Sequence, residues 1–250
     1  MPQETLPGCI FKEAEFPARS FRHLEKRMVL SRGCLSSLAL LTAVAGCGDN
    51  PADPDPTLPP VVDRYAAIPI DVVKVTPEMD KFPPILHTDE FLEPVPLPIV
   101  STAGGEDAPF IPLDGTELYF FFAADIRESA WNQIRDPVNG IWVSRQFGGV
   151  WQEPEFVWLQ DDDVLALNGC PWVAANEMLF CTARAGVTGL RWFQARRSGG
   201  SWAEWEVVTF RSEFEVGELH IHGDQLFYGS PMAGGEGGLD IWMLSRVDGA

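Results

Sequence analysis

The chain has 250 residues, of which 46% are hydrophobic and 11% aromatic, enough apolar material for a large buried core. Its net charge of −18 repels a phosphate backbone, so we expect an acidic surface and no nucleic-acid binding. The 23 glycines, 21 prolines and 9 tryptophans favour short strands joined by turns over a mainly helical protein.

Residues 1–46 are interpreted as an N-terminal extension followed by a signal peptide. Arg32 supplies a positive charge before the apolar run 35–44, which is shorter than the roughly 20 residues that a membrane-spanning helix needs. The mixed charges of residues 1–27 are not typical of a signal peptide, so we expect translation to begin at Met28.

The cysteine that follows this segment carries a further prediction. Residues 44–47 read VAGC, which resembles the lipobox of bacterial lipoproteins. The resemblance implies that the Cys47 thiol is acylated and anchors the protein to a lipid bilayer of the cell envelope. By the same resemblance, Gly48 after the cysteine favours the outer membrane, with the protein facing the periplasm or the exterior. The alternative is an ordinary signal peptide with an unrelated cysteine.

An acidic, proline-rich segment comes next in the chain. Residues 48–60 read GDNPADPDPTLPP and have no apolar periodicity, and such a sequence cannot bury enough surface to fold. We therefore expect a disordered leader, an extended tether over residues 47–80 and a folded domain over residues 81–250.

The folded domain contains an internal repeat. Three units with a similar order of apolar, Trp-containing and Arg-containing segments begin near residues 109, 170 and 218. Corresponding residues recur about 50 positions apart, and Arg145, Arg196 and Arg246 are one such series. Several matches in the same order indicate that one structural unit is repeated.

Turn signals inside the units predict antiparallel strands. Asp114-Gly115 and Gly223-Asp224 are hairpin signals between short apolar segments, and no stretch after residue 60 has a sustained helical period. Four short strands in about 50 residues fit one blade of a β-propeller. The expected fold class is all-β, with about three blades of four-stranded antiparallel sheet from an incomplete propeller. The insertion 125–139 should be a surface loop, and the alternative fold is a β-sandwich.

The repeat motifs also carry a resemblance to a known family. The motifs E-x-x-P-F-x-x-x-D-G-x-x-L-Y-F at 106–120, G-x-W-x-E-P at 149–154 and G-G-x-G-G-x-D-I-W at 234–242 are similar to WD40-like β-propeller repeats of periplasmic, Tol-type bacterial proteins and lipoproteins. The likeness covers residues 85–250 and implies a propeller outside the cytoplasm. It specifies the repeat more closely than any function, and the second unit departs from it at residues 174–176, which read AAN in place of Asp-Gly.

Cys170 and Cys181 flank the hairpin of the second unit. With a two-residue turn at Ala175-Asn176, they would lie directly opposite each other on paired strands, at a separation that suits a disulfide. An exported protein meets an oxidising compartment, so we expect a disulfide between them. The alternative is a pair of buried free thiols.

Three carboxylates and two histidines are candidate ligand-binding residues. Glu106, Asp107 and Glu218 precede the first strand of their units, at the end that lies near the central channel of a propeller. His220 and His222 point to one face of a strand and could bind a metal together with Glu218. Paired surface histidines are more common than such a site, so we expect no bound metal.

These observations favour a binding protein over an enzyme. The sequence contains no nucleophile elbow, phosphate-binding loop or HExxH motif, and the acidic run 161–163 lacks the spacing of a calcium loop. We expect a lipid-anchored propeller that uses no cofactor and binds an envelope protein or a glycan. The competing hypothesis is a carbohydrate-active enzyme, glycosidase or sialidase-like, in which the candidate carboxylates act as general acid and base.

Overall fold

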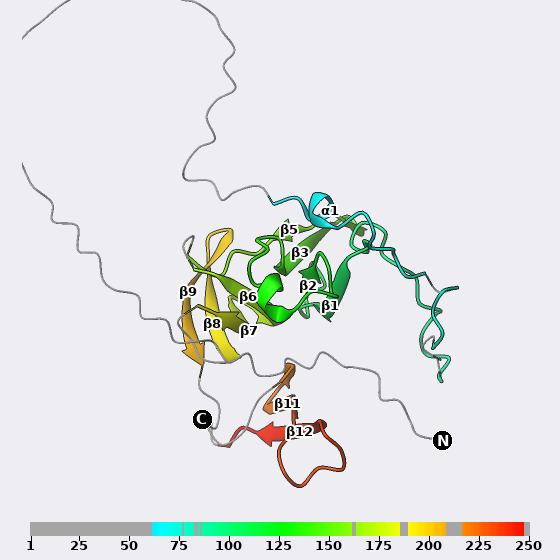
Figure 1. Ribbon diagram of the computed structural model, residues 1–250. Coiled ribbons are helices and arrows are strands. Elements are labelled where there is room, and N and C mark those ends of the chain that lie inside the picture. Colours follow the sequence, from blue (N-terminus) through cyan, green and yellow to red (C-terminus); the bar gives the residue numbers. More distant parts are fainter. Residues whose placement is uncertain are drawn as a thin grey trace, which may run out of the picture. The chain divides into compact units, whose positions relative to one another are not determined.

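The computed structural model describes residues 62–76, 78–82, 85, 87–161, 164–185, 190–208 and 217–247. The predicted start at Met28, the signal peptide, Cys47 and the first part of the tether lie outside these residues. The described chain is mostly β-structure (Figure 1). It has two helices, α1 (Arg64–Ala67) and α2 (Ala130–Gln133), and in this part of the chain no helix is long and apolar enough to cross a membrane.

The strands form three antiparallel sheets in chain order, named here sheets 1, 2 and 3. Sheet 1 contains β1 (Gly105–Phe110), β2 (Glu117–Ala123), β3 (Gly140–Phe147), β4 (Val150–Trp151) and β5 (Glu155–Phe156). Sheet 2 contains β6 (Ala166–Ala174), β7 (Glu177–Arg184), β8 (Arg191–Ser198) and β9 (Ser201–Val208). Sheet 3 contains β10 (Leu219–His222), β11 (Gln225–Ser230) and β12 (Asp240–Ser245). Consecutive strands pair within each sheet except that β5 pairs with β3. This arrangement confirms the predicted all-β chain of successive antiparallel units, although only sheet 2 has the four strands predicted for every unit.

The hairpin turns at the ends of two first strands form where the sequence predicts them. Gly223-Asp224 joins β10 to β11, and Gly223 has a φ of +57°, a left-handed conformation that glycine adopts without strain. Ala175-Asn176 joins β6 to β7, with Ala175 at a φ of +50°. A side chain at that φ is strained, so the surrounding sheet must hold this turn in place.

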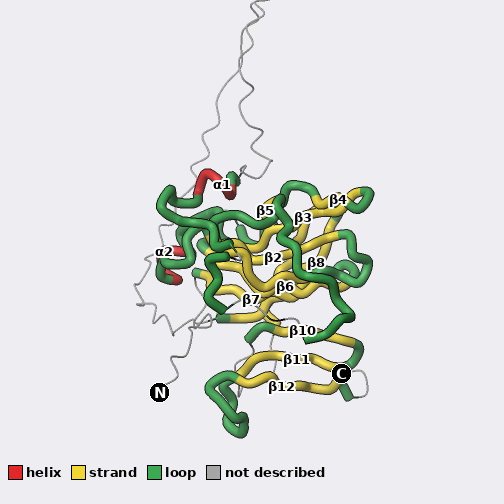
Figure 2. Tube along the Cα trace, turned by 90° about the vertical axis from the view of Figure 1, so that its right-hand side faces the viewer, coloured by secondary structure: helices red, strands yellow, loops and turns green. Residues whose placement is uncertain are grey.

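The sheets pack face to face in the order 1, 2, 3 (Figure 2). The junction of sheets 1 and 2 is a mainly apolar layer made by Tyr119, Ile141, Val143, Val173, Met178, Phe180, Phe193 and Ala195, with Val157 and Leu159 from the connection. The junction of sheets 2 and 3 is made by Leu179, Cys181, Trp192, Leu219, Leu226, Tyr228, Trp242 and Leu244. Each side chain in these layers is removed from water by a neighbouring sheet, which is the main force that holds the stack together.

Strand register relates the sheets to one another. Three cross-strand aromatic pairs occupy the same position in the three sheets, and they are Phe120–Trp142, Phe180–Phe193 and Tyr228–Trp242. Each pair faces the layer that precedes its sheet in the chain. Because side chains alternate along a strand, the adjacent positions face the layer that follows. Every sheet therefore has one face for the layer before it and one for the layer after it.

A segment from before the repeats covers the preceding face of sheet 1. This N-terminal cap, residues 62–68 and 97–102, places Val62, Ala67, Ile68, Ile99 and Val100 against Phe120, Phe122 and Trp142. The Asp63 carboxylate starts α1 by accepting hydrogen bonds from two backbone N–H groups of its first turn. Residues 62–68 fall within the predicted tether of residues 47–80, so part of that segment packs against sheet 1.

The insertion between β2 and β3, residues 125–139, is predicted to be a surface loop, but part of it is buried. Ile134 and Val138 are buried, and Val138 packs in the same apolar cluster as the N-terminal cap. The Asn139 side-chain oxygen accepts a hydrogen bond of 2.8 Å from the Ala124 backbone N–H and ties the end of the insertion to β2. The prediction is wrong for these residues because apolar side chains near the end of the insertion fold back onto sheet 1.

Charged groups also link sheets 1 and 2. Arg197 of β8 donates hydrogen bonds of 2.6 Å to the Glu117 carboxylate and to the Tyr119 hydroxyl of β2. Burial by itself would raise the pKa of Glu117, but hydrogen bonds from Arg197 and Tyr119, with the charges of Arg197 and Arg145, outweigh it and lower this pKa. Glu117 is therefore ionised at neutral pH and stabilises the junction.

Candidate functional site

The first strands of the three sheets, β1, β6 and β10, are neighbours, and two of them share a bulge of the same form. In segments 107–110 and 169–172, two strand residues lie opposite one residue of the partner strand. Ala108 and Cys170, at the first bulge position, have φ values of +48° and +50°. A proline follows each of them and has no N–H group that the interrupted ladder would leave unpaired.

The residue after each bulge places an aromatic ring where the first strands meet. Phe110, Trp172 and His220 hold the same register position in the three sheets, opposite Tyr119, Leu179 and Phe227. The Phe110 ring centroid lies 6.2 Å from that of Trp172 and 6.0 Å from that of His220. The Trp172 Nε1–H group also donates a hydrogen bond of 3.3 Å to the backbone oxygen of Ile221 in β10. We name Phe110, Trp172 and His220 the aromatic cluster.

The charges of two carboxylates act on a thiol of sheet 2. A hydrogen bond with Cys181 raises the pKa of the Cys170 thiol, and burial and the negative charges of Glu218 and Asp107 raise it further. Partial burial of the Glu218 carboxyl group, followed by the charge of Asp107, raises the pKa of Glu218. These four side chains therefore interact electrostatically. We name Asp107, Cys170, Cys181 and Glu218 the acid–thiol cluster.

The two cysteines differ by one position from their predicted register. Cys181 pairs directly with Gly169, because the bulge places Cys170 and Pro171 together opposite Phe180. The two thiols are nevertheless within hydrogen-bonding contact of each other. Both are free thiols in the structure, with Cys181 buried and Cys170 half-buried. The disulfide between them stays a prediction.

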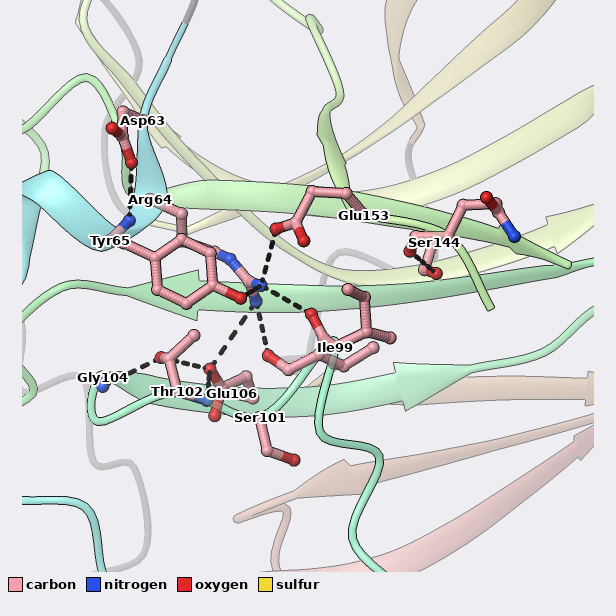
Figure 3. Close-up of polar contacts among 12 residues, drawn as sticks. Asp63, Arg64, Tyr65, Ile99, Ser101, Thr102, Gly104, Glu106, Ser144 and Glu153 are labelled. Atoms are coloured by element: carbon pink, nitrogen blue, oxygen red, sulfur yellow. Dashed lines mark hydrogen bonds and ion pairs between the residues drawn. The ribbon is translucent and has the colours of Figure 1, made fainter. Parts of the chain in front are cut away.

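Glu106 has surroundings different from those of Asp107, because neighbouring side chains of β1 point to opposite faces. Its Oε1 atom accepts hydrogen bonds from the Thr102 backbone N–H at 2.9 Å and the Thr102 hydroxyl at 2.6 Å (Figure 3). The same atom lies 3.7 Å from a guanidinium nitrogen of Arg64. The carboxylate predicted to bind a ligand therefore holds the N-terminal cap on sheet 1.

Arg64 is at the centre of the contact between the cap and sheet 1 (Figure 3). It is 2% exposed, and its guanidinium donates hydrogen bonds to the backbone oxygens of Val100 at 2.6 Å and Ile99 at 3.1 Å. A Glu153 carboxylate oxygen lies 3.6 Å away. Four aromatic rings surround the guanidinium at 5.1 to 5.7 Å, those of Tyr65, Phe120, Phe122 and Trp142. Arg64 precedes the repeats and has no counterpart in them, so the sequence pattern carries no signal for it.

The two histidines share one face of β10, as the sequence predicts, and both are exposed. In the ranges that the structure describes, no three His, Cys, Asp or Glu side chains are placed to hold a metal ion. Asp161 is exposed, and Asp162 and Asp163 lie outside the described residues.

Phe110 and Trp172 are absent from the site residues predicted from sequence. Each follows a proline at the same place in its unit, Pro109-Phe110 and Pro171-Trp172, so a repeated Pro-aromatic pair was a visible signal. Its meaning depends on the convergence of strands from different sheets, which the spacing alone does not specify.

The chain matches no protein-family model, and neither a curated protein nor a solved structure matches it. The functional argument therefore rests on the residues and contacts of this chain.

Proposed function

We propose that the chain is a lipid-anchored binding module of the bacterial cell envelope, with its ligand site at the aromatic and acid–thiol clusters. The observation that carries the proposal is the convergence of Phe110, Trp172 and His220, equivalent residues of three repeats, beside Asp107 and Glu218. Rings and polar groups supplied by several elements can surround a ligand, as binding sites between elements commonly do.

A partial β-propeller is the arrangement that we propose for the three sheets. Propeller blades are four-stranded meanders arranged radially around a central channel. In support, each sheet is built from antiparallel strands that are consecutive in the chain, the sheets pack face to face, and their first strands are neighbours. A β-sandwich would distribute the repeats between two sheets, whereas here each repeat keeps its strands in its own sheet.

The chemistry of the site favours a glycan ligand. Aromatic rings offer apolar surface to the C–H face of a sugar ring, and carboxylates accept hydrogen bonds from its hydroxyl groups. Phe110 and Trp172 are half-buried, while Asp107, Glu218 and His220 are exposed, so both kinds of group are accessible from solvent. An envelope protein with polar loops is the second partner class that the sequence supports.

Cys47 is the proposed anchor, and the tether after it would end at the N-terminal cap. Fourteen residues lie between Cys47 and Val62, and such a segment spans at most about 50 Å when fully extended. Arg64 would transmit this attachment to sheet 1 through its buried contacts. Cells grown with an alkyne-tagged palmitate should label the wild-type chain but not Cys47→Ala. Equal labelling of the variant would contradict the anchor.

The binding proposal is tested with the full chain and immobilised envelope glycans, namely peptidoglycan fragments and lipopolysaccharide. Asp107→Asn and His220→Ala should each weaken binding about tenfold, the effect of losing one hydrogen bond to a charged group or one ring contact. His87→Ala and Asp161→Asn are matched controls, because both residues are exposed and lie outside the clusters. Absence of binding, or equal loss in the controls, would contradict the site.

One observation favours a second candidate function, a glycoside hydrolase. The raised pKa of Glu218 is the property of a general acid, and Asp107 could serve as the second carboxylate. Aryl glycosides distinguish the two functions. Turnover that is lost in Glu218→Gln while glycan binding persists would establish the enzyme, and binding without turnover supports the binding module.

A further inference from the structure

The two thiols of sheet 2 lie at its bulge, on the face that meets sheet 3. Cys181 is buried in this junction, and its sulfur would lie 3.7 Å from a Cβ added to Gly169, its partner in the ladder. Cys170 is the first bulge residue, and it packs against the same junction. The two thiols are in hydrogen-bonding contact with each other. The pair is therefore placed for a single cross-link between β6 and β7.

The same bulge sets the position of one ring of the aromatic cluster. Trp172 follows Cys170 by two residues, and the ring of Pro171 between them fixes the backbone φ angle there. The Trp172 ring centroid lies 6.2 Å from that of Phe110 in sheet 1, and its Nε1–H group donates a 3.3 Å hydrogen bond to the Ile221 backbone oxygen in sheet 3. Trp172 thus connects sheet 2 with both neighbouring sheets, and a movement of the bulge changes these contacts.

The bulge is a conformation that other contacts must hold in place. Cys170 has a φ of +50°, a left-handed value that is strained for a residue with a side chain. The extra residue also interrupts the ladder between Gly169 and Trp172. A strained residue in an interrupted ladder opens more readily than a regular strand does. We therefore expect the reduced bulge to open locally and to displace Trp172 when it does.

Sheet 1 contains the same bulge without the thiols. Ala108 stands at the register position of Cys170, and Phe121 stands at that of Cys181. The bulge of sheet 1 cannot be cross-linked, whereas the bulge of sheet 2 can. The two bulges therefore form a matched pair within one chain, and they differ in whether a disulfide can close them.

We propose that Cys170 and Cys181 form a redox latch, whose disulfide holds the bulge closed, keeps Trp172 in the aromatic cluster and strengthens binding at the ligand site. The effect on binding rests on the proposed function, and the latch itself does not. On oxidation, two S–H bonds break and one S–S bond forms, while oxidised glutathione accepts two electrons and two protons and becomes two reduced glutathione molecules. The cross-link removes open states of the bulge, so less conformational freedom is lost when a ligand binds.

The first test measures the latch without a ligand. All samples are the full chain with Cys9→Ser, Cys34→Ser and Cys47→Ser, so that the two thiols of sheet 2 are its only cysteines. Hydrogen exchange of residues 169–174 should slow about tenfold after oxidation by oxidised glutathione. Residues 107–111, which contain the bulge of sheet 1, should keep their rate and serve as the internal control. A pair that stays reduced, or an unchanged rate in residues 169–174, would overturn the latch.

The second test measures binding of the same chain to immobilised peptidoglycan fragments and lipopolysaccharide. The oxidised chain should bind severalfold more tightly than the reduced chain. A variant with both Cys170→Ser and Cys181→Ser should bind equally in oxidised and reduced glutathione. Trp172→Ala should remove the difference between the oxidised and reduced chains, because the latch acts through this ring.

The two tests separate a failure of the latch from a failure of the proposed function. Equal affinity of the oxidised and reduced chains would overturn the inference and leave the binding function intact. Binding by neither form would contradict the proposed function and, with it, the effect on affinity. Slowed exchange of residues 169–174 would in that case still establish the latch.

Discussion

At sheet 1, the face that precedes the repeats is covered by the N-terminal cap, whose buried Arg64 contacts backbone oxygens and four aromatic rings. At sheet 3, the face that follows the repeats holds Ile241 and Met243 in solvent. The two ends have similar apolar patterns, because the repeat dictates the same alternation in each sheet. The face of sheet 1 is covered by the N-terminal cap, whose residues lie outside the repeat.

The largest expected effect compares one register position at a buried junction and on the exposed face of sheet 3. Ile141→Ala should lower the free energy of unfolding by about 2–5 kcal/mol, because it leaves a cavity in a packed layer. Ile241→Ala should change it by less than about 0.5 kcal/mol. Urea titration measures both free energies. A large loss for Ile241→Ala would show that this side chain is packed in the folded chain.

The contact between the N-terminal cap and sheet 1 is tested by removing the Arg64 guanidinium. Arg64→Ala should lower the free energy of unfolding by about 2–3 kcal/mol, since two hydrogen bonds from a charged donor are lost in a buried site. Arg64→Lys should recover part of this, because an ammonium keeps the charge but not the planar group among the rings. Arg127→Ala removes the ion pairs of an exposed guanidinium with Asp71 and Asp125 and should cost less than about 1 kcal/mol.

If the cap is as important as its contacts imply, hydrogen exchange in β2 and β3 should accelerate in Arg64→Ala and stay unchanged in sheet 3. Uniform acceleration across all three sheets would instead show that the stack unfolds as one unit and that the two ends are not independent.

Strand alternation, hairpin turns and the order of the units could be predicted from the sequence, because all three depend on neighbours within about 50 residues. Gly223-Asp224 and Ala175-Asn176 are turns for local reasons. The cap could not be predicted in this way. A proline-rich segment with one arginine looks like a solvated tether until the rings that surround Arg64 are known.

Parts of the candidate site also depend on tertiary contacts that the sequence pattern does not reveal. Asp107 acts on Glu218 through its charge, whereas Glu106 contacts the cap, since one step along β1 reverses the direction of a side chain. A one-residue bulge likewise changes the partner of Cys181 from Cys170 to Gly169. Bulges depend on the tertiary fit between sheets, and the predicted hairpin contained no indication of one.

Oxidation of Cys170 and Cys181 tests sheet 2. Oxidised glutathione would accept two electrons from Cys170 and Cys181, form their disulfide and leave two reduced glutathione molecules. The short loop that it closes should raise the free energy of unfolding by about 2 kcal/mol. Because the pKa of Cys170 is raised, the reaction should accelerate as the pH increases.

Cys170→Ser is the control for this experiment and should show no gain in stability with oxidised glutathione. Peptide mapping must find Cys170 joined to Cys181, because other cysteines lie in the N-terminal region. Complete alkylation of both thiols after prolonged oxidation would disprove the bond, and the bulge would then be a barrier to it.

The smallest expected effect concerns Glu218, which directly precedes sheet 3. A carboxyl pKa that is raised on folding means that the folded chain favours the protonated form, so stability is lost as the pH rises from the ordinary value of 4.5 through the raised one. Glu218→Gln keeps the shape and removes the repulsion from Asp107. It should raise Tm slightly at neutral pH and leave it unchanged below pH 4.5, where native Glu218 is already neutral.

Glu206→Gln, at an exposed position of β9, should lack this pH dependence. An equal gain at both pH values would mean that the gain does not come from the charge of Glu218. Slower hydrogen exchange of β10 in Glu218→Gln at neutral pH would place the effect in sheet 3.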